Sequence, residues 1–282
     1  MKKILLTGSS GQLGSSLRFI SNKYSEFQFE FTDINELDIC NLESLKEYLI
    51  KNSPHFVINC AAYTAVDKAE SEPDVCYLLN AEAVKNLAEA CKLVNSKLIH
   101  ISTDYVFDGR QSIPYREDDS PNPETVYGKS KLKGELYLKD NADAIMIRTS
   151  WLYSQFGHNF LRTILKYGNE KEELRVVNDQ NGSPTFASDL AEGILSIIGD
   201  TFKPGIYHYC NNGIITWFDF AKEIIEESGL NCKIIPIETK NYPTPAPRPA
   251  YSVLDTGKIR DAFGLTIPDW KSSLHKCLDL LK

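Results

Sequence analysis

The chain has little that suits a membrane or a nucleic acid. Its opening stretch, MKKILLTGSS, becomes polar too soon for a signal-peptide core, and no later apolar run approaches the length of a membrane span. Positive charge is in deficit, since 31 Lys and Arg face 38 Asp and Glu for a net charge of −7, and no basic run occurs. We therefore predict a cytoplasmic protein with no nucleic-acid partner and no membrane partner.

Disulfide and metal patterns are missing as well. The seven cysteines are odd in number and scattered, no CxxC occurs, and the five histidines show no ligand spacing. We predict reduced, mostly buried thiols and no metal site. His100 lies in the apolar run KLIHIS, which favours a core residue over a metal ligand.

What the sequence does have is alternation of strands and helices. In the first half, short apolar runs such as KILLT, HFVINCAAY and KLIHIST alternate with helical stretches, which predicts an α/β fold with a doubly wound parallel sheet of the Rossmann type. After Trp151 the alternation loosens, and we predict a smaller C-terminal α/β substrate-binding region. The predicted division is 1–150, with a return segment at about 187–211, against 151–186 and 212–282.

A proline cluster interrupts this second region. Prolines cannot sit inside a helix or a central strand, so the segment IPIETKNYPTPAPRPA is predicted to be irregular. It is either a loop that lines a site or a plain connector.

A glycine pattern follows the first predicted strand. LLTGSSGQLG places Gly8, Gly11 and Gly14 between a strand and a helix, where glycines permit a tight turn and close approach to a pyrophosphate at the helix N-terminus. Asp33, at the end of the second strand, is placed to accept hydrogen bonds from ribose hydroxyls. This favours NAD, because a carboxylate repels a 2′-phosphate. The alternative for Asp33 is a turn or helix cap.

Polar side chains also follow the strand KLIHIS. In a parallel sheet, ligands bind at the carboxyl ends of the strands, which is where Ser102, Thr103, Asp104 and Tyr105 fall. A hydroxyl here can donate to a carbonyl oxygen. A plain strand-end role for Thr103 is the alternative.

Two Tyr–Lys pairs have helical spacing. Tyr127 and Lys131 lie in TVYGKSKLKGE, and Tyr167 and Lys171 lie in KYGNEKEEL. Either pair alone reads as a surface contact. Tyr127 opens a helix just after the strand edge, whereas Gly168, which follows Tyr167, favours a helix end. We therefore predict a function for the first pair only.

Together, the glycine pattern, the strand-end hydroxyl and YxxxK resemble the extended short-chain dehydrogenase/reductase superfamily. More narrowly, NCAAYTAVDKAESEP, HISTDYVFDG, YGKSKLKGE, IRTSWLY, NDQNGSPT and YPTPAPRP resemble the dTDP-4-dehydrorhamnose reductase family, in order along nearly the whole chain. The resemblance implies reduction of the 4-keto group of dTDP-4-dehydro-L-rhamnose by NADPH or NADH. The product, dTDP-L-rhamnose, serves bacterial surface polysaccharide synthesis.

The resemblance also implies roles for individual residues. Tyr127 matches the proton donor of the family. Lys131 matches its lysine partner, which lowers the pKa of the tyrosine and holds the nicotinamide ribose. Thr103 matches the hydroxyl that donates a hydrogen bond to the reacting oxygen. Asp104, Tyr105 and Trp151 match positions that hold the sugar nucleotide, which assigns 151–186 and 212–282 to that ligand. Further cofactor contacts are implied for Gly11, Gln12, Leu13, Asp33, Asp38, Ile39, Ala61, Ala62 and Tyr63.

Ser16 departs from the family pattern. Some members dimerise through magnesium held by glutamates, and one of these glutamates falls at position 16. We therefore predict a monomer or weak homodimer that requires no metal. One alternative function is a reductase or epimerase acting on another nucleotide-4-keto-sugar. The other is a non-catalytic regulatory binding module, against which the intact set of Thr103, Tyr127 and Lys131 argues.

Overall fold

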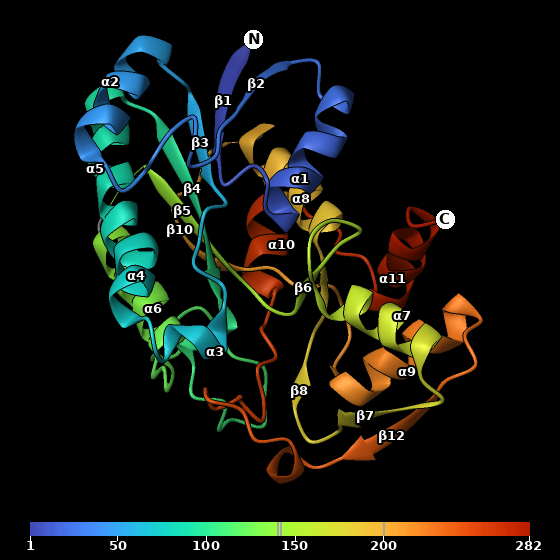
Figure 1. The fold of residues 1–282 in the computed structure, drawn as a ribbon. Coiled ribbons are helices and arrows are strands. Elements are labelled where there is room, and N and C mark those ends of the chain that lie inside the picture. The colour runs from blue at the N-terminus through green and yellow to red at the C-terminus, as the bar shows by residue number, and fades with distance from the viewer. Residues whose placement is uncertain (140, 142, 200) are drawn as a thin grey trace.

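A six-stranded parallel sheet forms the centre of the larger part of the molecule (Figure 1). The computed structural model describes residues 1–139, 141, 143–199 and 201–282. The strand order is β10-β5-β4-β3-β1-β2 and every pairing is parallel, as predicted. The strands are β1 (Lys2–Thr7), β2 (Phe27–Phe31), β3 (Phe56–Asn59), β4 (Lys97–Thr103), β5 (Ala144–Thr149) and β10 (Gly205–His208).

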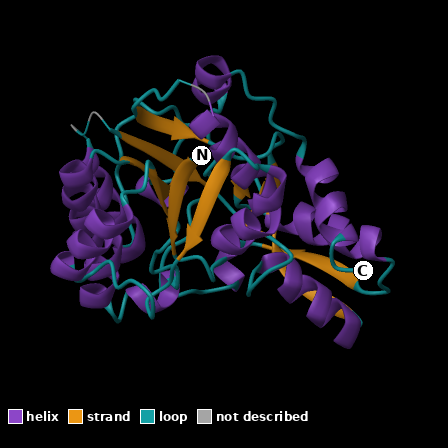
Figure 2. Cartoon of the chain, turned by 90° about the horizontal axis from the view of Figure 1, so that it is seen from above, coloured by secondary structure: helices purple, strands orange, loops and turns teal. Residues whose placement is uncertain are grey.

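Helices cover both faces of this sheet, as the view from above shows (Figure 2). One face packs in a core with α1 (Gln12–Ile20), α8 (Ala187–Gly199) and α10 (Gly257–Phe263). The other packs with α2 (Leu42–Asn52), α5 (Ala83–Val94) and α6 (Val126–Leu138). The predicted Rossmann-type fold class is confirmed. None of the helices in the described ranges is long and apolar enough to cross a bilayer.

The helical segment that follows β3 and α3 is not continuous. It consists of α4 (Pro73–Tyr77), a wide π-helical turn over Leu78–Glu82, and α5. The turn carries Asn80, whose buried side chain accepts from the backbone N–H of Tyr63 at 2.8 Å and donates to the hydroxyl of Ser130 at 3.0 Å. Such turns often occur at functional sites. Here the turn ties the segment after β3 to α6.

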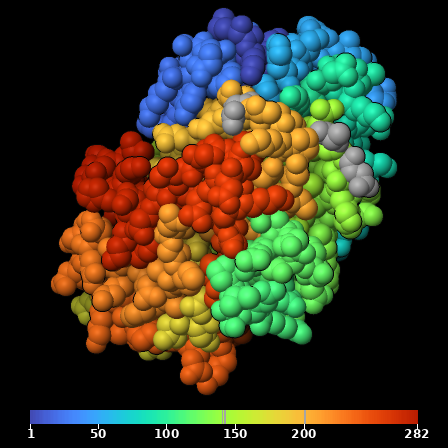
Figure 3. Space-filling model, turned by 180° about the vertical axis from the view of Figure 1, so that it is seen from behind, coloured from blue at the N-terminus to red at the C-terminus, as the bar shows by residue number. Residues whose placement is uncertain are grey.

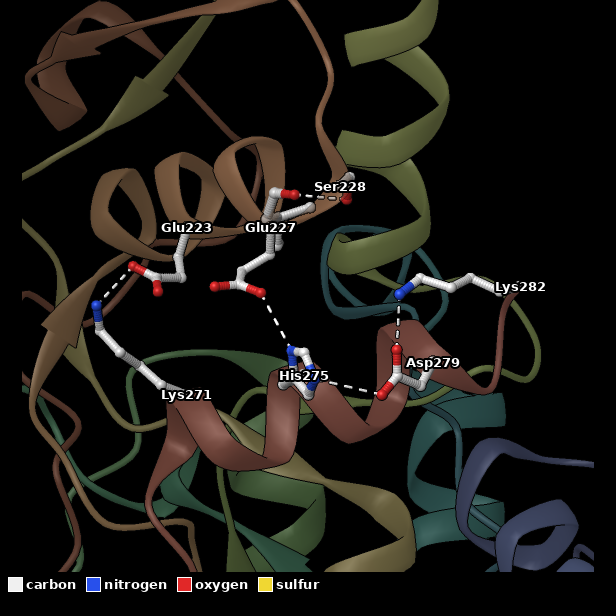
Figure 4. A network of polar contacts seen from close by, with 8 residues as sticks. Glu223, Glu227, Ser228, Lys271, His275, Asp279 and Lys282 are labelled. Carbon is white, nitrogen blue, oxygen red and sulfur yellow. Dashed lines mark hydrogen bonds and ion pairs between the residues drawn. The ribbon is translucent and has the colours of Figure 1, made fainter.

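The smaller region has its own apolar core. It packs α7 (Phe160–Glu170), α9 (Trp217–Ser228) and α11 (Trp270–Asp279) on the parallel pair β7 (Glu173–Val177) and β12 (Lys233–Ile237). Polar contacts join α9 to α11 (Figure 4): Lys271 with Glu223 at 2.7 Å and His275 with Glu227 at 3.2 Å. These contacts are largely exposed, so the buried apolar side chains stabilise the region more than they do.

The remaining elements of the described chain are short. They are α3 (Val66–Ala69), β6 (Leu152–Tyr153), β8 (Asn181–Gly182), β9 (Thr185–Phe186), β11 (Ile215–Thr216) and 3₁₀ turns at Ser21–Lys23, Asp104–Val106 and Thr239–Asn241.

From behind, the chain after β4 lies against the C-terminal segment (Figure 3). Tyr115 bridges to Leu254 there, with its N–H donating to the carbonyl of Val253 at 2.9 Å. All seven cysteines are free and five are buried. His100 is fully buried, which confirms its predicted position in the core.

Candidate functional site

The glycine loop between β1 and α1 is fixed by close packing. Gly8 has φ +66°, and a Cβ there would lie 2.5 Å from the backbone nitrogen of Ala61. A Cβ at Gly14 would lie 2.5 Å from the carbonyl oxygen of Gly8. Gly11 caps the N-terminus of α1, and its Cβ would meet nothing closer than that same oxygen, at 3.4 Å. Packing therefore requires the first and third glycines, whereas the second leaves space at a helix N-terminus, which suits a phosphate.

A cavity of about 490 Å³ lies beside this loop, along the carboxyl ends of β1 and β3. Its apolar side chains suit a flat heteroaromatic ring. Seven of the predicted cofactor residues line it, namely Gly8, Gly11, Asp33, Asp38, Ile39, Ala61 and Ala62. Sequence reasoning missed the other lining residues, which are Thr7, Ile34, Leu37, Cys40, Cys60, Val75, Leu78 and Leu79.

Three predicted cofactor residues have side chains turned elsewhere. Leu13 is buried in the core of the first sheet face. Gln12 accepts from the amide of Asn159 at 2.9 Å and from the hydroxyl of Ser154 at 3.1 Å, so it reaches the segment before α7. The hydroxyl of Tyr63 donates to Glu72 at 2.7 Å. Gln12 and Leu13 can therefore meet a cofactor only through their backbone.

Asp33 makes the turn contacts considered for it and also lies at the cavity, while its contact with a ribose stays a prediction. Its carboxylate accepts from the N–H of Ser10 at 2.9 Å and from the N–H of Ile34 at 2.8 Å, so it ties the glycine loop to the end of β2. It also lines the cavity. Burial raises the pKa of Asp33, but these N–H donors lower it, and the net pKa lies below its ordinary value. The carboxyl is therefore ionised at neutral pH.

The end of β4 meets the start of α6. Thr103 is buried; its hydroxyl donates to the Oδ1 of Asp104 at 2.9 Å and accepts from the N–H of Tyr105 at 3.2 Å. Tyr127 lies in the first turn of α6, and its ring centroid is 5.6 Å from that of Tyr105. A Cβ on Gly128 would overlap the carbonyl oxygen of Tyr105, so only glycine permits this docking of α6.

The charges of this group are set by burial. Burial raises the pKa of Tyr127 above its ordinary value, against a hydrogen bond with Thr103 that lowers it. Burial lowers the pKa of Lys131 to about 8 and raises that of Asp104 to about 6. Desolvation therefore dominates the pKa of Tyr127, and the expectation that Lys131 lowers this pKa stays a prediction.

A second cavity of about 490 Å³ lies between the two regions and contains two of the three predicted sugar-nucleotide residues, Tyr105 and Trp151. Trp151 has φ +47°, rare for a bulky residue, and stacks on Trp217 with centroids 3.6 Å apart. The third predicted residue, Asp104, is buried beside Thr103 and is not part of this lining. The cavity lining missed by sequence reasoning consists of Asp67, Phe160, Thr163, Ile164, Leu174, Arg175, Val176, Val177, Gln180, Trp217 and Tyr242.

The proline-rich segment reaches this cavity. Thr244, Arg248 and Pro249 line it, and the guanidinium of Arg248 donates to Asp67 at 2.7 Å. The proline-rich segment is therefore a loop that lines a cavity and not a plain connector.

Tyr167, predicted to have no role, also lies at this cavity. It is 38% exposed, and the ammonium of Lys171 lies 4.8 Å from its ring centroid.

Metal-binding geometry is not found in the described part of the chain, where no three His, Cys, Asp or Glu side chains gather closely enough to hold an ion. Ser16 is fully buried, and its hydroxyl donates to the carbonyl of Gln12 at 2.9 Å. Its side chain therefore faces the interior.

Comparison with known proteins gives matches over the full length. The family model described as the RmlD substrate binding domain matches residues 1–282. The chain is 41% identical over 281 residues to the spore coat polysaccharide biosynthesis protein SpsK of Bacillus subtilis, covering 99% of this chain and 97% of that protein. It is 41% identical over 286 residues to the dTDP-4-dehydrorhamnose reductase of Aggregatibacter actinomycetemcomitans, covering 97% of each.

A solved structure is equally similar. The dTDP-4-dehydrorhamnose reductase of Bacillus anthracis, in complex with NADP, superposes with a TM-score of 0.95 at 38% identity and covers all of both chains.

Proposed function

Because the chain belongs to the family of the RmlD substrate binding domain over its whole length, we propose that it is an NAD(P)H-dependent oxidoreductase that reduces dTDP-4-dehydro-L-rhamnose to dTDP-L-rhamnose. The observation that carries this proposal is the position of Thr103, Tyr127 and the buried Lys131 where β4 ends and α6 begins. Relatives named for this reductase activity, each about 40% identical over nearly full length, support it.

The cofactor and the sugar nucleotide are proposed to bind in separate cavities. We assign the cofactor to the sheet region, residues 1–150 with 187–211, and the sugar nucleotide to 151–186 and 212–282. The glycine cradle fits a dinucleotide, because Gly11 leaves space at the N-terminus of α1, where a pyrophosphate would bind. Trp151 and Tyr105 would contact the sugar nucleotide in the second cavity, and Asp104 would act from the buried end of β4.

The chemistry divides between cofactor and protein. The bound nicotinamide supplies a hydride to C4 of the sugar. Tyr127 gives its proton to the keto oxygen as negative charge develops there, and the Thr103 hydroxyl donates a hydrogen bond to that oxygen. To do so, Thr103 turns from the Oδ1 of Asp104, while the N–H of Tyr105 keeps its oxygen in place. Lys131, when protonated, stabilises the tyrosinate that remains.

We propose that both NADPH and NADH serve. The Asp33 carboxylate faces the first cavity and opposes a 2′-phosphate, whereas the Bacillus anthracis relative holds NADP. We expect kcat/KM for the two cofactors to differ by less than about a hundredfold, or about 2.7 kcal/mol. Steady-state oxidation of each cofactor measures this ratio. EDTA is present in the assay because we expect the reaction to require no metal. A larger preference for NADPH would refute the role given to Asp33.

The same assay separates the alternatives. A panel of dTDP-, UDP- and GDP-4-keto sugars tests whether another nucleotide sugar is the substrate. An epimerase would convert its sugar without net cofactor oxidation, and a regulatory module would bind without turnover.

The proposed location is the cytoplasm. The proposed assembly is a monomer or weak homodimer, because the buried Ser16 cannot reach a metal shared between subunits.

A further inference from the structure

Lys131 is a buried amine in an unusual setting. Its side chain is 2% exposed, and its Nζ donates to the carbonyl of Ile101 at 2.6 Å. In the described part of the chain, no carboxylate forms an ion pair with it, because Glu135, one turn further along α6, is held by Arg148 at 2.7 Å. Its other polar neighbour is the Nε2 of His100, at 3.5 Å. An ammonium in such a site lacks the anion that normally compensates its burial.

The proton on His100 can be located from its other neighbour. Asn59 is 1% exposed, and its Oδ1 accepts from the backbone N–H of Ala61 at 3.1 Å and from the hydroxyl of Thr7 at 2.7 Å. A backbone N–H can only donate, so this oxygen cannot be exchanged with the amide nitrogen. The Nδ2 of Asn59 therefore faces the Nδ1 of His100, 3.0 Å away, and donates to it.

Since Nδ1 accepts, a neutral His100 carries its proton on Nε2, pointing toward Lys131. An N–H in that position can donate to an uncharged amine but opposes an ammonium. The charged and titratable groups around Lys131 act in both directions. Glu135, Cys76 and Cys60, from α6, α4 and the end of β3, favour the ammonium, whereas burial disfavours it. Burial and Lys131 in turn lower the pKa of His100 well below its ordinary value, which keeps the ring neutral.

We propose that His100, held in the Nε2–H tautomer by Asn59, is a positioning residue that favours the uncharged amine of Lys131 and so sets the pH above which the ammonium that stabilises the tyrosinate is lost. The uncharged amine accepts a hydrogen bond from the Nε2–H of His100. This inference rests on the proposed function.

The tautomer is tested directly in the wild-type protein. NMR of ¹⁵N-histidine-labelled protein, with the His100 signals assigned through His100→Gln, reports which ring nitrogen carries the proton. We expect a neutral ring with the proton on Nε2 between pH 6 and 9. A proton on Nδ1, or a charged ring, would overturn the proposal without any need for a variant.

The coupling to Lys131 is tested with Asn59→Asp. The carboxylate keeps the acceptor for Ala61 and Thr7 but replaces the donor to His100, so the ring must carry its proton on Nδ1 and offer a lone pair to Lys131. We expect the titration midpoint of Lys131, followed by the ¹³Cε shift of labelled lysine and assigned with Lys131→Met, to rise by about 1 pH unit or more. The basic limb of kcat should move upward with it.

Asn52→Asp provides the matched control, because Asn52 ends α2 and its amide donates only to the carbonyl of Tyr48. An unchanged or lower midpoint in Asn59→Asp, or an equal rise in Asn52→Asp, would overturn the proposal. If the wild-type protein fails to reduce any 4-keto sugar, the proposed function fails, while both NMR measurements still decide the role of His100.

Discussion

Tyr127 and Lys131 on α6 have the same residue types and spacing as Tyr167 on α7 and Lys171 just beyond its end, and a glycine follows each tyrosine. On α6 the lysine is buried, and its pKa is lowered to about 8. At the end of α7 the tyrosine is 38% exposed, and the lysine lies over its ring as a cation–π contact. The same spacing thus gives one pair within a helix and one pair across a helix end, and only the packing around α6 can alter the chemistry of its pair.

The largest expected effect comes from Tyr127→Phe. This change removes one hydroxyl and little volume, so folding and cofactor binding should persist while the keto oxygen loses its proton donor. We expect kcat to fall by roughly 10²–10⁴. The measurement is steady-state reduction of dTDP-4-dehydrorhamnose. If the variant retains more than about a tenth of the wild-type kcat, a loss under about 1.4 kcal/mol, the catalytic role proposed for Tyr127 is wrong.

Lys131→Met should lower activity and stabilise the fold. We expect kcat to fall by about 10²–10³ and the dissociation constant of NAD(P)H to rise about tenfold, because a charged donor is lost. Combined with Tyr127→Phe, the loss should be far from additive, as for residues that act together. Cofactor affinity is measured by fluorescence titration.

The same variant has a stability signature that depends on pH. A pKa of about 8 in the fold, below the ordinary value of 10.5, penalises folding at neutral pH, and the penalty disappears as pH rises through 8 toward 10.5. Lys131→Met should therefore stabilise the protein at pH 7 by up to about 3 kcal/mol and have little effect above about pH 10.5. Chemical denaturation at the two pH values checks this, with the exposed Lys171→Met as control.

The glycines that follow the two tyrosines allow a third test. A Cβ at Gly128 would overlap a backbone oxygen of Tyr105, whereas a Cβ at Gly168 would meet the end of the flexible Ile225 side chain. We expect Gly128→Ala to cost about 1–3 kcal/mol of unfolding free energy and to lower kcat through displacement of α6. Gly168→Ala should change stability by less than about 1 kcal/mol. An equal loss of unfolding free energy in the two variants would mean that α6 and α7 are packed equally closely at these glycines.

The smallest effects are expected on α7. Tyr167 lines the second cavity, so Tyr167→Phe should raise KM for the sugar nucleotide by no more than about threefold, equivalent to about 0.6 kcal/mol, with kcat unchanged. Lys171→Met should leave both unchanged. A fall in kcat comparable to that of Tyr127→Phe would remove the distinction between the pairs.

Local patterns predicted the sheet and the glycine loop well, because each depends on residues close together in sequence. The contacts of Gln12 were not predictable, since Ser154 and Asn159 lie 142 and 147 residues further along the chain. Asn59 and His100 lie on neighbouring strands and read in sequence only as parts of apolar runs. The contact of Asn59 with His100, whose ring also faces Lys131, depends on strand register, which pairs residue 59 with residue 100.

The environment of Tyr167 is a second feature that local sequence patterns could not predict. Gly168 correctly indicated the nearby end of α7, but the cavity wall that includes Tyr167 is assembled from distant segments such as Thr244 and Arg248. A helix position can be predicted from a few neighbours, whereas membership of a cavity requires the tertiary fold.

Gln12 links the walls of the two cavities. It opens α1 directly behind Gly11, yet its side chain accepts a hydrogen bond from Asn159, the residue that caps α7, and α7 also bears Tyr167 on the wall of the second cavity. A shift of the loop beside the first cavity would therefore also displace the residue at which α7 begins.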